Sequence, residues 1–290
     1  MNAFAHQFIG GLASGMIYAS LALALVMIHQ ATHLLNFAQG EMAMFSTYIA
    51  WALIDAGLPF WVAFVLALAA AFAIGVAVQY FLIRHVHSSS PLPVVVVLIG
   101  LLVIFNSVAG WLFTYSTKVF PSPFPTEPLF GQHYMSSHEL GAALVTLVML
   151  LLLFVFFRFT SLGLAMRAVA QNPVSSRLVG IRVGRMLALG WGLAAAVGAV
   201  AGIMVAPIVY LEPNMMSGIL LNAFAAALVG GIDSPGGAVV GGLLVGVLES
   251  LLGAYVVGNE LKQAVALALI VGVLLVRPSG LFGRMQVTRV

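Results

Sequence analysis

Long runs of apolar residues constrain this chain more than any other feature of its sequence. The segment 60–83 contains no Asp, Glu, Lys or Arg, and it exceeds the ~20 residues that an α-helix needs to cross the hydrocarbon core of a bilayer. Only 7% of the 290 residues are charged and 62% are hydrophobic, whereas soluble domains carry about 25% charged residues. So few charges cannot cover a surface in water, which predicts an integral membrane protein.

Similar runs follow one another along the whole chain. They lie at residues 8–28, 41–54, 60–83, 92–113, 140–157, 186–210, 216–229, 238–257 and 261–276. Because some of them are too short to cross a bilayer alone, we expect about eight or nine transmembrane segments, with broken or re-entrant helices among them. The prediction is an all-α, polytopic membrane protein, whose residues 1–290 form a single transmembrane domain with a Pro-rich external loop at 114–138.

The positive charges are distributed unevenly, which predicts the orientation of the chain. No Lys or Arg precedes Arg84, whereas residues 158–185 hold five of the eleven Lys and Arg residues. Segments rich in Lys and Arg stay on the cytoplasmic side of a membrane. We therefore expect an external N-terminus, a cytoplasmic C-terminus and a cytoplasmic loop at 158–185. The net charge of +3 reflects this orientation and indicates no nucleic-acid partner.

A short amphipathic helix is predicted inside the basic loop. Asn172 is a good N-cap and Pro173 fits the first helical position. Val174 and Leu178 share one helical face, and Gly180 is expected to end the helix. Because so short a helix is marginal alone in water, it needs a surface to lie on. That surface is either a groove in another protein or the lipid headgroups.

The apolar pattern is first interrupted between the runs 8–28 and 41–54. Asn36, Gln39 and Glu41 lie there. This region is either one span with a polar start or a broken, partly re-entrant helix. Irregular backbone at membrane depth survives only inside protein or beside water, so the three residues are candidates for a translocation pathway. The alternative is an interfacial helix start, at which Asn36 or Gln39 caps free backbone N–H groups.

A second interruption is the Gly- and Pro-rich turn at 230–237. The pathway candidates in and beside it are Asn222, Asp233 and Ser234. The two interruptions fall in opposite halves of the chain, and short, broken apolar segments in corresponding positions are typical of an inverted repeat. We therefore expect such a repeat to relate the two halves.

Small residues spaced four apart predict close packing between helices. The residues with this spacing are Gly11, Gly15, Gly237, Gly241, Gly242 and Gly246. Glu249 lies deep in the run 238–257, where a carboxylate is costly and is a functional hypothesis by default. We expect it to be a hydrogen-bonded strut between helices, with a place in the translocation pathway as the alternative. No catalytic or metal-ligating set is expected.

Four motifs are spread nearly end to end along the chain. They are LLNFAQGE at 34–41, RAVAQNPVSSRLVGI at 167–181, AFAAALVGGIDSPGGAVVGG at 223–242 and RPSGLFG at 277–283. Together they resemble the permease subunits of high-affinity branched-chain amino acid ABC transporters, and the LivH-like one of the two membrane subunits in particular. Gln39 stands where many members have His, and Asp233 stands where many have Gly.

The resemblance implies a permease subunit that translocates branched-chain or related amino acids across the bacterial inner membrane. It also implies several partners besides the lipid bilayer, namely a second, similar permease subunit, two cytoplasmic ABC ATPases that use ATP and Mg²⁺, and a periplasmic solute-binding protein. The coupling segment of the family maps onto 172–180. The residues implied in coupling are Arg167, Asn172, Pro173, Val174, Arg177, Leu178 and Gly180.

Other functions remain as alternatives to this interpretation. The chain contains no G-x-x-x-x-G-K-[ST] phosphate loop, so it is predicted to be no enzyme and to bind no cofactor itself. A permease for urea or short amides belongs to the same family, and an ion-coupled secondary transporter is a different class. Such transporters use several buried ionisable groups, which are scarce here. A membrane scaffold or intramembrane enzyme is the third hypothesis, and the spans lack the residue sets that catalysis would need.

Overall fold

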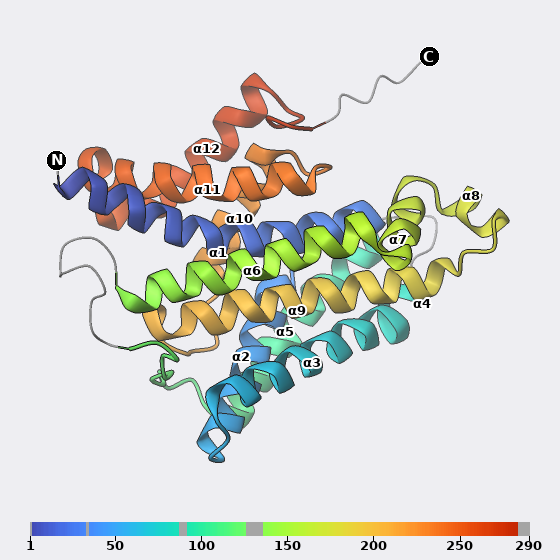
Figure 1. Ribbon diagram of the computed structural model, residues 1–290, viewed down its shortest axis with the longest axis horizontal. Coiled ribbons are helices and arrows are strands. Elements are labelled where there is room, and N and C mark those ends of the chain that lie inside the picture. Colours follow the sequence, from blue (N-terminus) through green and yellow to red (C-terminus); the bar gives the residue numbers. More distant parts are fainter. Residues whose placement is uncertain (1, 33–34, 87–91, 126–135, 284–290) are drawn as a thin grey trace. The chain divides into compact units, whose positions relative to one another are not determined.

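The computed structural model describes residues 2–32, 35–86, 92–125 and 136–283. All regular structure in these ranges is helical (Figure 1). The extended pairing among them is an isolated antiparallel bridge between Lys118 and Leu211. The prediction of an all-α fold is therefore confirmed.

The helices are named in chain order. They are α1 (Asn2–Thr32), α2 (Gln39–Asp55), α3 (Phe60–Val78), α4 (Arg84–Val86), α5 (Leu92–Phe113), α6 (Ser137–Phe159), α7 (Ser161–Gln171), α8 (Pro173–Leu178), α9 (Val183–Val209), α10 (Ser217–Gly230), α11 (Pro235–Leu252) and α12 (Lys262–Val276). Two π-helical turns continue α3 at Gln79–Ile83 and α11 at Gly253–Val257, and a 3-10 turn at Asn259–Leu261 precedes α12.

The described chain contains six helical stretches that are long and apolar enough to cross a membrane. They are Ala3–Gln30, Phe60–Val86, Leu92–Phe113, Ser137–Phe159, Val183–Val209 and Pro235–Val257. The other three predicted segments form α2, α10 and α12, with 17, 14 and 15 residues, fewer than the ~20 that a span needs. A polytopic helical membrane protein with short, interrupted helices is thus confirmed, and the inverted repeat stays a prediction.

A non-helical stretch separates α1 from α2 at the first interruption of the apolar pattern. Helix α1 ends at Thr32 and α2 begins at Gln39, with Asn36 in the non-helical stretch between them. The structure therefore places Asn36 before one unbroken helix, and both the span with a polar start and the partly re-entrant helix stay predictions.

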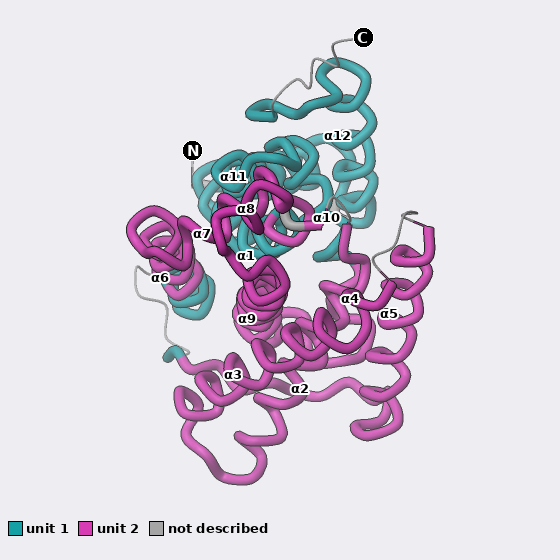
Figure 2. The backbone as a smooth tube through the Cα atoms, turned by 90° about the vertical axis from the view of Figure 1, so that its right-hand side faces the viewer, with its two compact units in different colours: residues 1–26, 124–144, 218–290 teal, residues 27–123, 145–217 magenta. Residues whose placement is uncertain are grey.

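The described residues group into two compact units (Figure 2). Unit 1 comprises residues 1–26, 124–144 and 218–290, and unit 2 comprises residues 27–123 and 145–217. Each unit is assembled from segments that lie far apart in the sequence. The single domain over the whole chain stays a prediction.

In unit 2, α9 is the helix on which the others pack. It contacts both α2 and α3, and α2 also contacts α3 and α5. Glycines permit this close approach, because a Cβ on Gly202 would lie 2.9 Å from the Ala43 carbonyl oxygen, and one on Gly75 would lie 2.9 Å from the Gly192 Cα. Small residues at such crossings let helix backbones meet inside a membrane.

In unit 1, α11 carries glycines on two of its faces. Gly242 and Gly246 lie against α1. A Cβ on Gly15 would lie 2.9 Å from the Gly242 carbonyl oxygen, and a Cβ on Gly11 would lie 2.9 Å from the Gly246 carbonyl oxygen. Gly237 and Gly241 instead lie against the backbone of α10. The small residues singled out in the sequence therefore serve two helix–helix contacts of α11.

The motif RPSGLFG at 277–283 closes the end of α10. Leu281 N–H donates to the Val229 carbonyl over 2.8 Å, and Phe282 N–H donates to the Gly230 carbonyl over 3.0 Å. The last carbonyl groups of a helix lack partners within the helix, so the motif satisfies two of them. Gly231, whose φ is +106°, supplies the turn conformation that this contact requires.

Two helix starts differ from the sequence expectation. Helix α6 begins at Ser137, whereas the sequence placed its start at residue 140. The Glu139 carboxylate accepts from Ser136 N–H over 2.9 Å, and Glu139 N–H donates to the Ser136 hydroxyl over 3.1 Å, which is a capping box. Helix α7 was not expected as a separate element, and the Thr160 hydroxyl caps it by accepting from Gly163 N–H over 3.0 Å.

Candidate functional site

The start of α8 has the geometry that its sequence predicts. The Asn172 side-chain oxygen accepts a hydrogen bond of 2.9 Å from Ser175 N–H, and Pro173 occupies the first helical turn. An N-cap of this kind contributes about 1 kcal/mol. The predicted cap is confirmed, and it fixes the point at which the loop becomes a helix.

The end of α8 is fixed as firmly as its start. Gly180 has a φ of +85°, a conformation that glycine adopts without strain. Its N–H donates to the Arg177 carbonyl over 3.1 Å, and Ile181 N–H donates to the Ser176 carbonyl over 3.0 Å. These two bonds form a Schellman motif. The predicted stop at Gly180 is confirmed, so α8 is a short helix with defined ends.

Apolar side chains of α8 point away from the protein. Val174 is 67% exposed and Leu178 is 84% exposed, while Ser176 is buried. Helix α8 contacts α7 and α9, so its buried side faces its own unit. Val174 and Leu178 are four residues apart and share one helical face, so α8 presents a small apolar surface outward.

Helix α7 precedes α8 in the chain and packs against it. Its buried residues include Met166 and Val169, and it contacts α9 as well as α8. Arg167, on the opposite side, is exposed, and so is Arg177 of α8. The residues implied in coupling therefore lie on two adjoining helices that unit 2 holds in place.

The first interrupted region forms a buried hydrogen-bonded network in unit 2. Asn36 Nδ2 donates to the Gln39 side-chain oxygen over 3.1 Å, and Gln39 Nε2 donates to the Ala194 carbonyl of α9 over 2.9 Å. The Asn36 Oδ1 accepts from Ala38 N–H over 3.1 Å. Asn36 and Gln39 are both fully buried. Their amides hold the break between α1 and α2 against the middle of α9.

Glu41 lies next to this network and is also buried. Asn106 of α5 places its amide nitrogen 3.4 Å from the Glu41 carboxylate, 3.1 Å from the Pro213 carbonyl and 3.1 Å from the Asn214 side-chain oxygen. One amide thus connects α2, α5 and the segment before α10. The sequence did not single out Asn106 or Asn214 as a site residue. The signal that could have found Asn106 is its position as a polar residue inside an apolar run.

A second buried polar cluster lies in unit 1. Asn222 Nδ2 of α10 donates to the Glu249 carboxylate of α11 over 3.2 Å. Tyr18 of α1 lies beside both side chains, within reach of a hydrogen bond. The Asn222 Oδ1 is buried without a hydrogen-bond partner among the described residues. Three helices therefore converge on one carboxylate, which the sequence had assigned to packing, and on Asn222, which it had assigned to the pathway.

The remaining pathway candidates lie in the Gly- and Pro-rich turn before α11. The Ser234 hydroxyl accepts from Gly237 N–H over 3.0 Å and caps α11, with Pro235 at the first helical position. Asp233 is exposed in the turn. The structure therefore places Ser234 in a helix cap and Asp233 at the surface, in contrast to the buried Asn222.

Taken together, the described residues define a class of protein. Apolar helices long enough to cross a membrane enclose buried amides and carboxylates, and polar groups inside membrane helices are typical of transport proteins. Residues 7–274 match the family described as branched-chain amino acid transport system, permease component. The chain belongs to this family.

Proteins similar to this chain include bacterial branched-chain amino acid permeases. LivH of Salmonella typhimurium, named a high-affinity branched-chain amino acid transport system permease protein, is 31% identical over 99% of this chain and 98% of its own length. LivH of Escherichia coli K12 and BraD of Pseudomonas aeruginosa are also 31% identical, with the same coverage. A chain of the solved structure of PsaBC from Streptococcus pneumoniae in complex with Fab aligns with 93% of this chain at 14% identity and a TM-score of 0.48.

Proposed function

We propose that this permease subunit imports branched-chain or related amino acids across a bacterial inner membrane. Its relatives support the substrate class, since LivH and BraD are branched-chain amino acid permeases. The proposal includes a second, similar permease subunit, two cytoplasmic ABC ATPases that hydrolyse Mg-ATP, and a periplasmic solute-binding protein. The N-terminus lies outside, because the positive charges begin only at Arg84, and the C-terminus, which carries Arg277, lies inside. Termini on opposite sides need an odd number of crossings, so the proposal includes a crossing by a shorter helix besides the six long ones.

The observation that carries the coupling part of this proposal is the geometry of α8. Its two ends are fixed by a side-chain cap and a Schellman motif, yet Val174 and Leu178 remain exposed. A short helix with fixed ends can transmit a displacement, and an apolar face can seat in a groove of a partner. We assign α8, with Arg167 on α7, to contact with an ATPase subunit.

The buried polar clusters support a role in translocation. Asn36, Gln39 and Glu41 in unit 2 and Asn222 in unit 1 are three amides and one carboxyl group that are buried in or beside apolar helices. Such groups are costly inside a membrane and mark functional sites. We assign these four residues to the pathway for a polar substrate. Glu249 contacts Asn222, and its part is that of a strut which holds Asn222 in position.

Reconstitution into liposomes tests the proposed function. The chain is compared alone and together with its second permease, ATPases and binding protein, with radiolabelled leucine outside and ATP at the ATPase side. We expect uphill leucine uptake only from the complete assembly with ATP. Uptake by the chain alone under an ion gradient would instead indicate a secondary transporter, and uptake of labelled urea but not leucine would replace the substrate class.

A further inference from the structure

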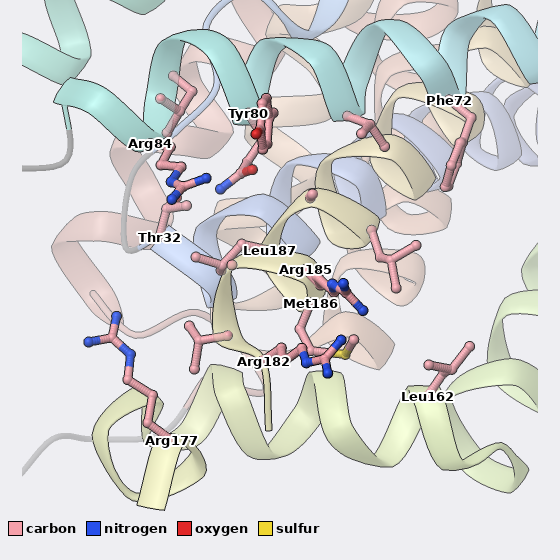
Figure 3. Close-up of a pocket in the computed structure, with 17 residues that line it drawn as sticks. Thr32, Phe72, Tyr80, Arg84, Leu162, Arg177, Arg182, Arg185, Met186 and Leu187 are labelled. Atoms are coloured by element: carbon pink, nitrogen blue, oxygen red, sulfur yellow. The ribbon is translucent and has the colours of Figure 1, made fainter. Parts of the chain in front are cut away.

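A cavity of about 970 Å³ lies within unit 2, apart from the buried polar clusters (Figure 3). The end of α3 and the π-helical turn at Gln79–Ile83 form one wall, and the loop helices and the start of α9 form the other. In Figure 3, Arg84 extends from the first wall and Arg177 from the second. Arg182 and Arg185 lie at the start of α9, to the right of both in this view.

The cavity concentrates positive charge that nothing in its own wall neutralises. Four arginines line it, and no Asp or Glu is among the described residues that line it. None of the four forms a side-chain hydrogen bond or an ion pair with another described residue. Arg84 lies over the Tyr80 ring, with 5.4 Å from its guanidinium carbon to the ring centroid. Guanidinium groups stay charged and match phosphate oxygens in geometry, so this cavity suits a phosphate group.

The rest of the cavity wall is apolar, which narrows the class of ligand. Phe72, Val76, Ile83 and Leu187 line it together with the arginines. A soluble phosphate compound would gain nothing from these side chains, whereas an acyl chain would bury its apolar surface against them. A phosphate next to an apolar wall is the chemistry of a phospholipid.

The position of the arginines along the helices agrees with this ligand. Arg84 follows an apolar stretch that ends at Ile83, and Arg185 precedes the apolar stretch of α9. Both therefore lie where a membrane helix passes from the hydrocarbon core to the headgroup layer. Basic pockets between helices at the cytoplasmic side bind the headgroups of anionic lipids.

We propose that this cavity is a binding site for an anionic phospholipid. The arginines that line the cavity hold the phosphate, with Arg84 and Arg177 on one side of it and Arg182 and Arg185 on the other. The acyl chains lie along the apolar wall of α3. Because Arg177 belongs to α8, the bound lipid connects the exposed loop helix to a membrane span, so that the lipid composition bears on the position of α8.

Lipid titration of the purified full-length chain in detergent tests the site. Native mass spectrometry compares dioleoylphosphatidylglycerol with dioleoylphosphatidylcholine, which has the same acyl chains but no net charge. We expect preferential retention of phosphatidylglycerol. The double variant Arg182→Gln/Arg185→Gln should weaken it about 25-fold, since each basic residue near an anionic membrane contributes about fivefold. Arg158→Gln/Arg167→Gln removes the same charge outside the cavity and should leave retention unchanged.

Gly184 provides a matched pair of variants that does not remove any arginine. It lines the cavity, and a Cβ built there meets no atom within 4 Å. Glu and Gln have nearly the same size and are both better helix formers than Gly, so both variants should fold. Gly184→Glu places a negative charge among the arginines and should reduce phosphatidylglycerol retention at least tenfold relative to Gly184→Gln.

Each outcome decides the proposal. Equal retention of the two lipids, equal binding by the Gly184→Glu and Gly184→Gln variants, or an equal loss in Arg158→Gln/Arg167→Gln would overturn the site. Competition by glycerol phosphate at the concentration of the lipid would show that the headgroup alone is bound, and would overturn the assignment of the apolar wall to acyl chains. Retention of phosphatidylglycerol that depends on the charge at residue 184 supports the proposal.

Discussion

Gln39 Nε2 donates a hydrogen bond of 2.9 Å to the Ala194 carbonyl, joining the start of α2 to the middle of α9. One turn further along α9, Gly198 leaves the space that the Gln39 side chain occupies, since a Cβ there would lie 2.6 Å from Nε2. The two features fit each other although the bonded residues are 155 positions apart in the sequence. In the network that holds the break between α1 and α2, the amide that reaches α9 is therefore fitted against a glycine.

Replacing that glycine tests the fit. Gly198→Ala should displace the Gln39 amide and leave its buried donor unpaired, at a cost of about 1–3 kcal/mol in the free energy of unfolding. Gly100→Ala in α5 is the matched control, because a Cβ there meets no atom within 4 Å. Thermal unfolding of the two purified variants in detergent, followed by tryptophan fluorescence, should show a lower midpoint for Gly198→Ala only. Equal midpoints would mean that Gln39 has room to move.

The contact between α1 and α11 makes a second prediction. A Cβ on Gly15 would lie 2.9 Å from the Gly242 carbonyl oxygen, whereas one on Gly10 meets no atom within 4 Å. Gly15→Ala should therefore separate the two helices and lower stability by about 1–3 kcal/mol, as overpacking does. Gly10→Ala changes the same helix by the same methyl group and should be neutral or slightly stabilising. The detergent midpoints of the two variants check this, and a midpoint of Gly15→Ala at or above that of Gly10→Ala would contradict it.

Glu249 permits a test that separates a strut from a pathway residue. Glu249→Gln keeps a side-chain oxygen that can accept from Asn222, so stability and leucine uptake should both be retained. Glu249→Leu removes the carboxylate that accepts from the Asn222 Nδ2. Because the Asn222 Oδ1 already has no hydrogen-bond partner among the described residues, this loss should lower the free energy of unfolding by about 1–3 kcal/mol. Unfolding midpoints and uptake are measured for both variants. Uptake lost in Glu249→Gln at unchanged stability would move Glu249 into the pathway.

Features that depend on neighbouring residues could be predicted from the sequence. The caps of α8 are an example, because Asn172 and Gly180 act on backbone groups within a few residues of themselves. The capping box of Ser136 and Glu139 was equally visible in the sequence. The apolar run of this span begins only after Glu139, so hydropathy alone places the start of α6 too late.

Features that depend on distant residues could not be predicted. Nothing near Gln39 indicates that its partner is the Ala194 carbonyl, since every residue carries such a group. Asn106 was recognisable as a polar residue in an apolar run, but its contact with Glu41 required the packing of α5 on α2. For the same reason, the sequence placed Asn222 and Glu249 in different roles although they share a hydrogen bond.

Thiol labelling tests the pathway assigned to the first interrupted region. The chain contains no Cys, so single cysteines at Asn36 and Glu41 can be labelled without background. We expect a small, polar, membrane-impermeant thiol reagent to modify both in the complete transporter during ATP turnover. Ser46→Cys is the control, because Ser46 is buried on the same helix as Glu41 and bonds to the Met42 carbonyl. Protection of Asn36→Cys and Glu41→Cys in every transport state would assign both to packing.

The exposed face of α8 makes the sharpest prediction about coupling. Leu178→Asp places a charge on the face that should enter an apolar groove of the partner. Loss of one central docking residue typically costs about 2 kcal/mol or more in binding free energy, which is about thirtyfold in affinity. We expect the complete assembly to lose leucine uptake, with basal ATP hydrolysis retained. Leu164→Asp introduces the same charge at an exposed leucine of α7 and should keep uptake. Unfolding midpoints of both variants should equal that of the unmodified chain, because neither side chain is buried. Uptake that survives Leu178→Asp, or that falls equally in Leu164→Asp, would show that α8 does not dock as proposed.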